Sequence, residues 1–394
     1  MRILIAHNYY QQAGGEDQCV AQELALLREH GHDVQLFSLH NDSINSMGKV
    51  HIAGAAIWNP VAYSKLRKTL RESRAEIVHF HNTFPLMSPA VYYAARAEAA
   101  KVVQTLHNYR LACANALLLR DGRVCEDCLT RFAPWKSIQH RCYRGSRAAS
   151  AMTTAVLATH RAAGTWRSAV QVYIALTEFA RRKLIAAGLP EERIIVKPNF
   201  VTPDPGPGKG GGNFAIFVGR LSDEKGVATL LAAWQLLGGA VPLRIVGDGP
   251  LAPLVREATE CDPAIQWLGK LPLDAVYRLI GEAEFAVLPS ICFEAFPRVI
   301  AEAFARGTPV IASRAGAMAE LVDETRTGRL FAPGDPGDLA RAVRQYWSNR
   351  SALAGMRVAA RTEFEDSFTA DLNYQYLMGA YARALTGSPA AEAA

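Results

Sequence analysis

Short apolar runs alternate with amphipathic stretches along the first half of the chain, which is the pattern of alternating strands and helices. The amphipathic stretches predict helices near residues 17–30, 62–72, 89–99, 146–167 and 177–187. The apolar runs between them predict strands at residues 2–6, 34–38, 77–80, 102–105, 170–175 and 194–196. This alternation predicts a parallel, doubly wound sheet in an α/β domain.

The same alternation resumes after a stretch rich in proline and glycine at residues 203–212, which predicts a linker. The strands predicted beyond it lie at residues 215–218, 243–246, 265–268, 285–288 and 309–312. Helices are predicted near residues 227–237, 251–259, 274–281, 298–306, 317–323, 338–347, 351–363 and 367–384. The pattern therefore predicts two Rossmann-like domains, residues 1–200 and 201–366, and a C-terminal segment, residues 367–394, with one helix and a disordered tail.

The composition agrees with two domains. The chain has 394 residues, of which 50% are hydrophobic, so each domain can bury its own core. Charged or polar residues interrupt every long apolar segment, and residues 1–6 lack the length and the basic lead of a signal peptide. We therefore expect a cytoplasmic protein.

The formal net charge of +6 is partly clustered in two segments of the first domain. Such clusters can meet anionic lipid, a phosphorylated acceptor or nucleic acid, and an ordinary solvated surface explains each cluster equally well. The first cluster comprises Lys65, Arg67, Lys68, Arg71 and Arg74, and the second comprises Arg131, Lys136, Arg141, Arg144 and Arg147.

The region 108–147 interrupts the alternation and predicts a long irregular insert, a feature that is usually functional. Four of the seven cysteines lie in it. Cys125 and Cys128 have the Cys-x-x-Cys spacing that suits one tetrahedral zinc, and Cys113 and Cys142 could complete a structural four-thiolate site. A set of free, partly buried thiols explains the same residues equally well.

Two glutamates, Glu294 and Glu302, flank the start of a predicted helix. The apolar run at residues 285–288 predicts a buried strand that leads into the loop with Glu294, and Pro297 suits the first turn of the helix that carries Glu302. Open α/β sheets bind ligands at the carboxyl ends of their strands, so this position predicts a ligand site. The alternative is a solvated helix face, but the apolar neighbours of Glu294 argue against it.

The loop after the predicted strand at residues 215–218 offers cations at the same edge of the sheet. Arg220 follows Gly219 and can bind phosphate oxygens through two N–H groups, and Lys225 adds a positive charge at the start of the next helix. The position favours a diphosphate site over a surface loop with ordinary charges. In the first domain, Gly14 and Gly15 follow the first strand, where ligand contact and a plain turn are equally good explanations.

Four histidines, His7, His79, His81 and His107, lie at or near the carboxyl ends of predicted strands in the first domain. A lone histidine there is often a satisfied polar group. Their spacing does not match a metal site, and several histidines at one edge predict polar recognition of a hydroxyl-rich substrate.

Taken in order along the chain, these motifs resemble those of family 4 glycosyltransferases, over about residues 2–385. The most specific part of the resemblance is the Glu-x7-Glu stretch of Glu294 and Glu302 together with its basic partners. The other matching motifs are Gly14-Gly15-Glu16, His107, Gly219-Arg220-Leu221, Lys225-Gly226 and Gly247-Asp248-Gly249.

The resemblance implies a glycosyltransferase B fold, with two Rossmann-like domains facing across a cleft and a last helix that crosses back to the first domain. It implies a retaining, metal-independent hexosyltransferase with no catalytic cofactor. The donor would be a UDP- or GDP-sugar bound by the second domain. The acceptor would be a glycan or a lipid-linked saccharide bound by the first domain. The pathway would be polysaccharide, lipopolysaccharide or exopolysaccharide biosynthesis at the inner membrane face, with no nucleic-acid partner.

The resemblance also implies a role for each site residue. Arg220 and Lys225, next to Gly219, would bind the donor diphosphate, and Glu302 would bind the donor ribose. His107 would contact the transferred sugar near the reacting centre. Gly15, next to Gly14, would contact the phosphate. Glu294 would bind sugar hydroxyls, together with the backbone of Ala295, Phe296, Pro297 and Arg298.

One departure concerns the donor sugar. The segment 295–298 reads Ala-Phe-Pro-Arg, where many members of the family have Gly-Phe-Gly or Gly-Phe-Pro, so the sequence leaves the donor sugar open. Two alternatives also stay open, another nucleotide-sugar enzyme of the same fold, such as an epimerase, and a non-catalytic, zinc-stapled basic scaffold. The joint presence of His107, Arg220, Lys225 and Glu294 favours the transferase.

Overall fold

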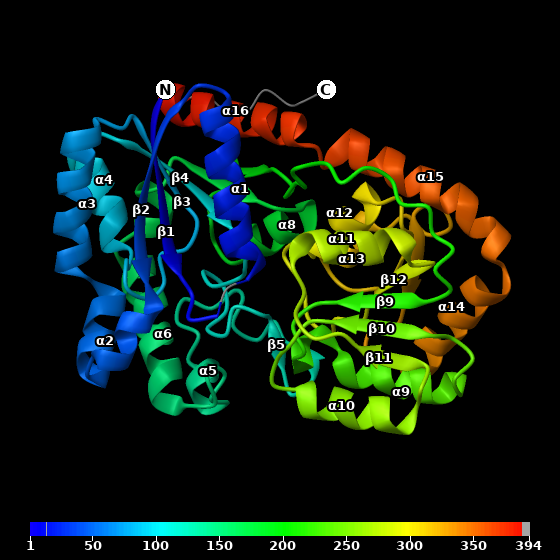
Figure 1. The fold of residues 1–394 in the computed structure, drawn as a ribbon. Helices are drawn as coiled ribbons and strands as arrows, with labels where there is room; N and C mark the ends of the chain where they lie inside the picture. Colours follow the sequence, from blue (N-terminus) through cyan, green and yellow to red (C-terminus); the bar gives the residue numbers. More distant parts are fainter. Residues whose placement is uncertain (13, 388–394) are drawn as a thin grey trace. The chain divides into compact units, whose positions relative to one another are not determined.

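The computed structural model describes residues 1–12 and 14–387, which form two compact units. Unit 1 comprises Met1–Ala116, Glu126–Pro198 and the chain from Asp371 onward, and unit 2 comprises Leu117–Cys125 and Asn199–Ala370. Each unit is an α/β domain with a parallel sheet, as the sequence pattern predicts (Figure 1). The predicted tail beyond Gly387 lies outside the described residues. In the part of the chain that the structure describes, every helix is too short or too polar to cross a membrane.

The sheet of unit 1 has six parallel strands in the order β2-β1-β3-β4-β7-β8. The order changes direction between β1 and β3, which makes the carboxyl ends of these two strands the place where such sheets bind ligands. The strand bounds are β1 (Arg2–Tyr9), β2 (Asp33–His40), β3 (Ile77–Phe80), β4 (Lys101–Leu106), β7 (Val172–Ala175) and β8 (Ile194–Val196).

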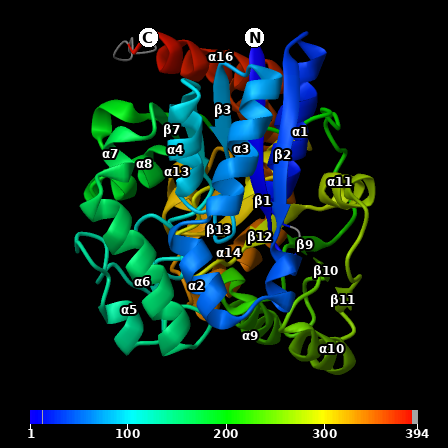
Figure 2. The same cartoon turned by 90° about the vertical axis from the view of Figure 1, so that its left-hand side faces the viewer.

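Two helices from opposite ends of the sequence complete one core of unit 1. Helix α1 (Gly15–Glu29) contributes Val20 and Leu27, and the last helix, α16 (Ala370–Thr386), contributes Leu377 and Tyr381, to the apolar cluster formed with the sheet. Figure 2 shows α3 and α4 lying over the sheet of the same unit. The remaining helices of unit 1 are α2 (Lys49–Ile57), α3 (Pro60–Ser73), α4 (Ala90–Ala97), α5 (Lys136–Gln139), α6 (Arg147–Ala162), α7 (Thr165–Ser168), α8 (Glu178–Ala186) and the 3-10 turns η1 (Asn41–Ser46) and η2 (Glu191–Arg193).

Unit 2 has a second six-stranded parallel sheet, in the order β11-β10-β9-β12-β13-β14. Its order changes direction between β9 and β12, which pair in parallel. Helices α9 and α14 pack together on one face, around Trp234 and Val343, while Figure 1 shows α11 and α12 on the other face. The strand bounds are β9 (Ala215–Val218), β10 (Leu243–Val246), β11 (Ile265–Trp267), β12 (Phe285–Leu288), β13 (Val310–Ser313) and β14 (Gly328–Phe331).

The helices of unit 2 follow the predicted segments closely. They are η3 (Asp223–Lys225), α9 (Val227–Leu237), α10 (Ala252–Cys261), α11 (Leu273–Glu282), α12 (Arg298–Ala305), α13 (Ala317–Leu321), α14 (Pro336–Ser348) and α15 (Arg350–Ser367). The insert of unit 1 also gives unit 2 a short segment, Leu117–Cys125, which contains the hairpin of β5 (Leu119–Arg120) and β6 (Arg123–Val124).

The proline- and glycine-rich segment at residues 203–212 is not a free linker, so this prediction is wrong. The chain passes into unit 2 earlier, after Pro198, and the segment then packs on unit 2. The amide of Gly208 donates to the Arg306 carbonyl over 2.8 Å, and the amide of Gly210 donates to the Gly281 carbonyl over 2.9 Å. Glycine is required because a Cβ at residue 208 would lie 2.3 Å from the Cα of Gly281.

We therefore expect Gly208→Ala to destabilise unit 2 by about 1–3 kcal/mol, the usual effect of adding a methyl group to a packed position. The matched control is Lys209→Ala, because the neighbouring Lys209 side chain is exposed. Chemical denaturation of both variants measures the difference. Equal free energies of unfolding would show that the segment is a loose connection after all.

Candidate functional site

The loop after β9 presents Arg220 to solvent at the carboxyl edge of the unit 2 sheet. Within the described residues, the exposed Arg220 side chain makes no hydrogen bond or ion pair. A glycine turn supports the loop from the β10 side. A Cβ at Gly247, whose φ is +137°, would lie 1.9 Å from the Gly219 carbonyl oxygen, and a Cβ at Gly249 would lie 2.5 Å from the Leu221 carbonyl oxygen. The two glycines thus allow close packing that fixes the loop.

The predicted cation and the first predicted carboxylate form an ion pair at this edge. The Lys225 Nζ lies 2.7 Å from the Glu294 Oε2, and the side chains are 30% and 12% exposed. The Ser290 hydroxyl donates to the other oxygen of Glu294. Burial opposes the charge of Lys225, but the neighbouring Glu294 carboxylate raises the pKa of the ammonium group. Lys225 therefore stays a cation, on the loop after β9 that also carries Arg220.

Close backbone contact explains why a glycine follows Lys225. Gly226 ends η3 with a φ of +68°, and a Cβ there would lie 1.8 Å from the carbonyl oxygen of Pro289. Residue 226 therefore presses against the loop that carries Glu294. The glycine thus has a structural reason, namely to bring the loops after β9 and β12 together.

The second predicted carboxylate, Glu302, lies inside α12 and is 5% exposed. Burial raises the pKa of this carboxyl group, and Arg298, whose Nη2 lies 3.6 Å from the Glu302 Oε1, opposes the shift. Ala295, Phe296 and Pro297 are also buried, where the chain enters this helix. The alternative of a solvated helix face is therefore wrong for Glu302.

In unit 1, the predicted ligand-binding residues include Gly14 and His107. Gly14 precedes α1 in an extended conformation with a φ of −138°, and a Cβ there would have no atom within 4 Å. The structure therefore gives no steric reason for this glycine. The half-buried His107 follows β4, and its Nε2 lies 2.9 Å from the His81 Nδ1.

The other three predicted histidines are not a recognition surface, because His7, His79 and His81 are each at most 3% exposed. This prediction is wrong. His79 and His81 instead join a buried network with Glu23 of α1 and Lys197, which follows β8. The Lys197 Nζ lies 2.7 Å from the Glu23 Oε1, and the His81 Nε2 lies 3.4 Å from the Glu23 Oε2.

This network has the ligand types of a metal site but already contains a cation. Glu23, His79 and His81 could together offer ligand atoms to an ion. However, the Lys197 ammonium group occupies one side of the carboxylate, and both nitrogens of His79 lie at hydrogen-bond distance from hydroxyl groups, of Tyr381 at 2.9 Å and Thr105 at 2.8 Å. A second positive ion would meet strong repulsion, so the residues do not fit a metal.

The predicted zinc cysteines are not gathered within unit 1. Among the described residues, Cys113, Cys128 and Cys142 do not form a group at metal-ligand distance, and Cys125 belongs to unit 2. The Cys113 Sγ instead lies 2.9 Å from the Asn115 Oδ1.

The zinc site stays a prediction that elemental analysis can test. A four-thiolate site would give close to one zinc per chain in the purified protein, and Cys125→Ser with Cys128→Ser would abolish the signal. Cys261→Ser is the matched control, since the exposed Cys261 lies outside the insert. Metal-free protein with unchanged stability would contradict the site.

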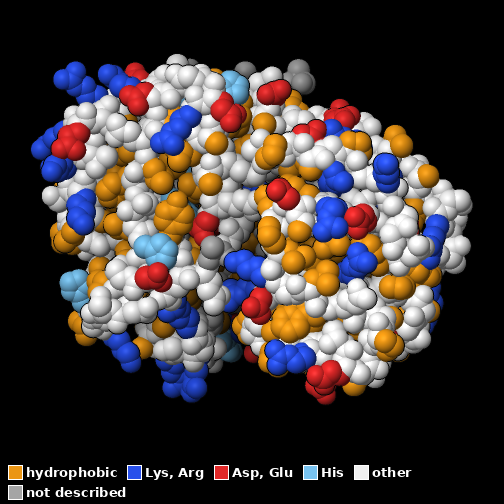
Figure 3. Space-filling model, in the orientation of Figure 1, with side chains coloured by type: hydrophobic (Ala, Val, Ile, Leu, Met, Phe, Trp, Pro, Cys, Tyr) orange, Lys and Arg blue, Asp and Glu red, His pale blue; other side chains and the backbone are white. Residues whose placement is uncertain are grey.

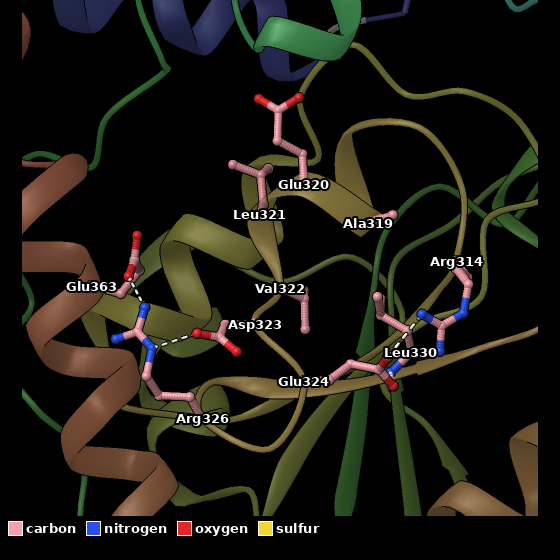
Figure 4. Close-up of a pocket in the computed structure, with 10 residues that line it drawn as sticks. All are labelled: Arg314, Ala319, Glu320, Leu321, Val322, Asp323, Glu324, Arg326, Leu330 and Glu363. Atoms are coloured by element: carbon pink, nitrogen blue, oxygen red, sulfur yellow. Dashed lines mark hydrogen bonds and ion pairs between the residues drawn. The ribbon is translucent and has the colours of Figure 1, made fainter.

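A pocket of about 540 Å³ lies elsewhere in unit 2 and contains none of the predicted donor residues. Figure 4 shows two sets of ion pairs at its wall, Arg326 with Asp323 and Glu363, and Arg314 with Glu324, while Glu320 points away from both. Because internal partners already hold its arginines, this pocket offers little free charge to an anionic ligand.

Several residues of the site carry no sequence signal that pattern reasoning could have used. Ser290 orients Glu294, and the Tyr277 hydroxyl is buried without a hydrogen-bond partner among the described residues. Burial and the charge of Glu302 raise the pKa of Tyr277. In the sequence, Glu23 looks like an ordinary charge on a helix and Lys197 like one at a strand end, yet both side chains are fully buried.

Comparison with known proteins gives consistent matches. The family profile described as "Glycosyltransferase Family 4" matches residues 13–205, and the profile "Glycosyl transferases group 1" matches residues 212–349. The chain is 35% identical over 159 residues to a glycogen synthase of Mycobacterium tuberculosis, covering 39% of this chain and 38% of the relative. The chain thus spans less than two fifths of the length of the first curated relatives that it matches.

Two other comparisons span most of the chain. The chain is 25% identical over 370 residues to a phosphatidyl-myo-inositol mannosyltransferase of Mycobacterium leprae, covering 87% of this chain and 86% of the relative. It is also similar to the crystal structure of Alr3699/HepE from Anabaena in complex with UDP, with a TM-score of 0.69 and 18% identity over 97% of this chain and 100% of the other.

Proposed function

Because the chain belongs to family 4 of the glycosyltransferases, we propose that it is a retaining hexosyltransferase that uses a nucleoside diphosphate sugar as donor. Its fold is the glycosyltransferase B fold. One observation carries the proposal, the ion pair of Lys225 and Glu294 at the edge where the unit 2 sheet changes direction, on the loops that follow β9 and β12.

These charges suit the departure of a nucleoside diphosphate. Breaking the bond between a sugar and a diphosphate builds negative charge on the leaving phosphate oxygens. Preorganised cations stabilise such charge in the transition state more than in the ground state, and this is usually the largest catalytic contribution. Arg220 and Lys225 would supply two cations, so the proposed reaction is independent of a divalent metal.

The glutamates would bind two other parts of the donor. Glu294, held by Lys225 and Ser290, would accept hydrogen bonds from sugar hydroxyls through its fixed carboxylate. Glu302 would bind the ribose from within α12. In unit 1, we propose that His107 contacts the transferred sugar, that Gly15 contacts the phosphate, and that this unit binds a saccharide or lipid-linked acceptor.

A panel of UDP-, GDP- and ADP-sugars tests the proposal through release of the nucleoside diphosphate. We expect one donor to be hydrolysed slowly without acceptor, and its nucleoside diphosphate to raise the melting temperature of the protein. NMR of the product anomer then reports retention. If every nucleotide-sugar left both the melting temperature and the sugar unchanged, the proposal would be wrong and the basic scaffold favoured. Conversion of the donor sugar without release of the diphosphate would indicate an epimerase.

The acceptor side has a surface that suits an anionic membrane. The segment that carries the second basic cluster has exposed arginines and two exposed aromatic side chains, Phe132 and Trp135, which are 61% and 51% exposed. Figure 3 shows basic side chains gathered at the lower margin of unit 1, where α5 and α6 lie. Each cluster has internal pairs, Arg67 and Arg71 with Glu98 in the first and Lys136 with Asp127 in the second, but only the second has exposed aromatic side chains within its own segment. We therefore assign membrane contact to the second cluster, because interfacial aromatics and basic residues together favour anionic lipid.

We expect the protein to bind vesicles that contain phosphatidylglycerol and not vesicles of phosphatidylcholine alone. The double variant Phe132→Ser with Trp135→Ser should weaken this binding about tenfold or more, because two aromatic side chains that the lipid would bury are lost. The control is Val358→Ser in unit 2, since Val358 is 69% exposed on α15. Equal binding of both variants in a sedimentation assay would argue against this surface.

A further inference from the structure

A buried chain of three side chains connects α1 to the predicted sugar-binding histidine. It runs from Glu23 through His81 to His107, and all three lie in unit 1. The Glu23 Oε2 lies 3.4 Å from the His81 Nε2, and the His81 Nδ1 lies 2.9 Å from the His107 Nε2. The side chains of Glu23 and His81 are fully buried, whereas His107 is half-buried. The chain thus ends at the edge of the sheet.

Glu23, at the buried end of this chain, is held in its charged form. Burial alone would raise the pKa of Glu23, but the Lys197 ammonium group and His81 hold it well below its usual range. Lys197 donates to the Glu23 Oε1 over 2.7 Å and also to the Asn373 Oδ1 over 3.2 Å. Glu23 is therefore a carboxylate, which can only accept hydrogen bonds.

A carboxylate at this position determines where the next protons lie. The His81 Nε2 and the Glu23 Oε2 face each other at 3.4 Å, and neither atom has a closer polar partner among the described residues. The nitrogen must therefore carry hydrogen, because two buried lone pairs that face each other would repel. In a neutral His81, the Nδ1 is then an acceptor, so the His107 Nε2 must donate to it. Burial holds the pKa of His107 well below its usual value, so its ring is neutral.

We propose that Glu23 and His81 are positioning residues that fix His107 as the neutral Nε2–H tautomer, with its Nδ1 available to accept a hydrogen bond from a hydroxyl of the transferred sugar. Within the described residues, the Nδ1 of His107 has no hydrogen-bond partner. This inference rests on the proposed function only in its last step, the contact with the sugar.

Replacement of one carboxylate oxygen of Glu23 by an amide NH₂ group should reverse the donor and acceptor roles of the histidine nitrogens along the chain. In Glu23→Gln, Lys197 still donates, so the amide oxygen must face Lys197 and the amide N–H group must face His81. The His81 Nε2 then becomes the acceptor, its Nδ1 carries the hydrogen, and the His107 Nε2 becomes the acceptor in turn. The His107 Nδ1 therefore changes from acceptor to donor.

The test is NMR of the full-length protein with ¹⁵N-labelled histidine rings, with the His107 signals assigned from His107→Gln. We expect the wild type to show the Nε2–H form of His107 and Glu23→Gln to show the Nδ1–H form. The kcat for transfer should fall about 10- to 100-fold in Glu23→Gln, a range typical of residues that orient a ligating histidine, with little change in the donor KM. An Nδ1–H form in the wild type, or no change in the variant, would overturn the proposal.

Three further variants separate positioning from folding. Tyr381→Phe removes the hydroxyl at 2.9 Å from His79 in the same network but leaves the chain intact, so it should keep both the tautomer and kcat. His81→Asn keeps the pair of Glu23 and Lys197 and should lower kcat as Glu23→Gln does, even if Glu23→Gln folds poorly. In a His107→Gln background, Glu23→Gln should cause no further loss. An equal loss in Tyr381→Phe, or an additive loss in the double variant, would refute the positioning role.

The failure of the proposed function is distinguishable from the failure of this inference. If His107→Gln transferred sugar at the wild-type rate, the sugar contact of His107 would be wrong. The ring NMR would still decide whether Glu23 sets the tautomer, because that measurement needs no substrate.

Discussion

Arg220→Ala should lower kcat/KM about 10²- to 10³-fold while leaving the melting temperature unchanged. A loss of one preorganised donor to a developing oxyanion typically costs about 2.7–4 kcal/mol of transition-state stabilisation. The stability should not change, because the Arg220 side chain is exposed and makes no hydrogen bond or ion pair among the described residues. Steady-state kinetics with the identified donor, together with thermal unfolding, measure both quantities.

Lys225→Ala should differ from Arg220→Ala in one respect, since it should also lower stability. Its removal leaves the Glu294 carboxylate, which is 12% exposed, without its cation. Loss of one partner of a largely buried pair is destabilising because the remaining charge is not compensated. The matched control is Arg278→Ala, a 67% exposed arginine on α11 of the same unit. Wild-type turnover in Arg220→Ala, or the same loss in Arg278→Ala, would contradict the diphosphate site.

Leu377→Ala on the last helix should destabilise unit 1, although residue 377 lies far from the rest of that unit in the sequence. Leu377 is fully buried in the cluster that α16 forms with α1 and the sheet. Removal of a buried leucine side chain costs about 2–5 kcal/mol, through lost apolar burial and the cavity that remains. Denaturant unfolding followed by tryptophan fluorescence, to which the buried Trp166 of unit 1 contributes, measures the change.

Gln375→Ala is the control on the same helix, and its exposed side chain should change the free energy of unfolding by less than about 0.5 kcal/mol. A chain truncated after Ala370 should lose the fold of unit 1 and all transfer activity. Full activity and an unchanged melting curve in the truncated chain would show that unit 1 does not need α16.

The sequence predicts both parallel sheets well because their strands are short apolar runs at regular intervals. The strand of residues 285–288 and the loop with Glu294 lie where the pattern places them. The pattern misses β14, which has four residues and begins with a glycine and an arginine. It also merges α6 and α7, which Gly164 separates with a φ of +65°.

The placement of the candidate site could be predicted where its residues adjoin a strand end, as for Arg220, Lys225 and Glu294, whose role in binding a diphosphate stays a prediction. It could not be predicted where partners are distant in the sequence. Lys197 and Glu23 are 174 positions apart, and each looks like a surface charge until the fold buries both. The same holds for residues 203–212, because a glycine selected for close packing has the same sequence signature as a glycine in a flexible joint.

The position of α16 has a consequence for the order in which the two units form during synthesis. Domains usually fold from the N-terminus as the chain leaves the ribosome. Here the residues of unit 2 are complete at Ala370, whereas unit 1 still lacks the helix that covers its core and the Asn373 that accepts from Lys197. We therefore expect the N-terminal unit to finish folding last. Until α16 has left the ribosome, the nascent unit 1 would expose an apolar sheet face and a partly solvated Glu23–Lys197 pair, and we expect ribosome-bound chaperones to bind it.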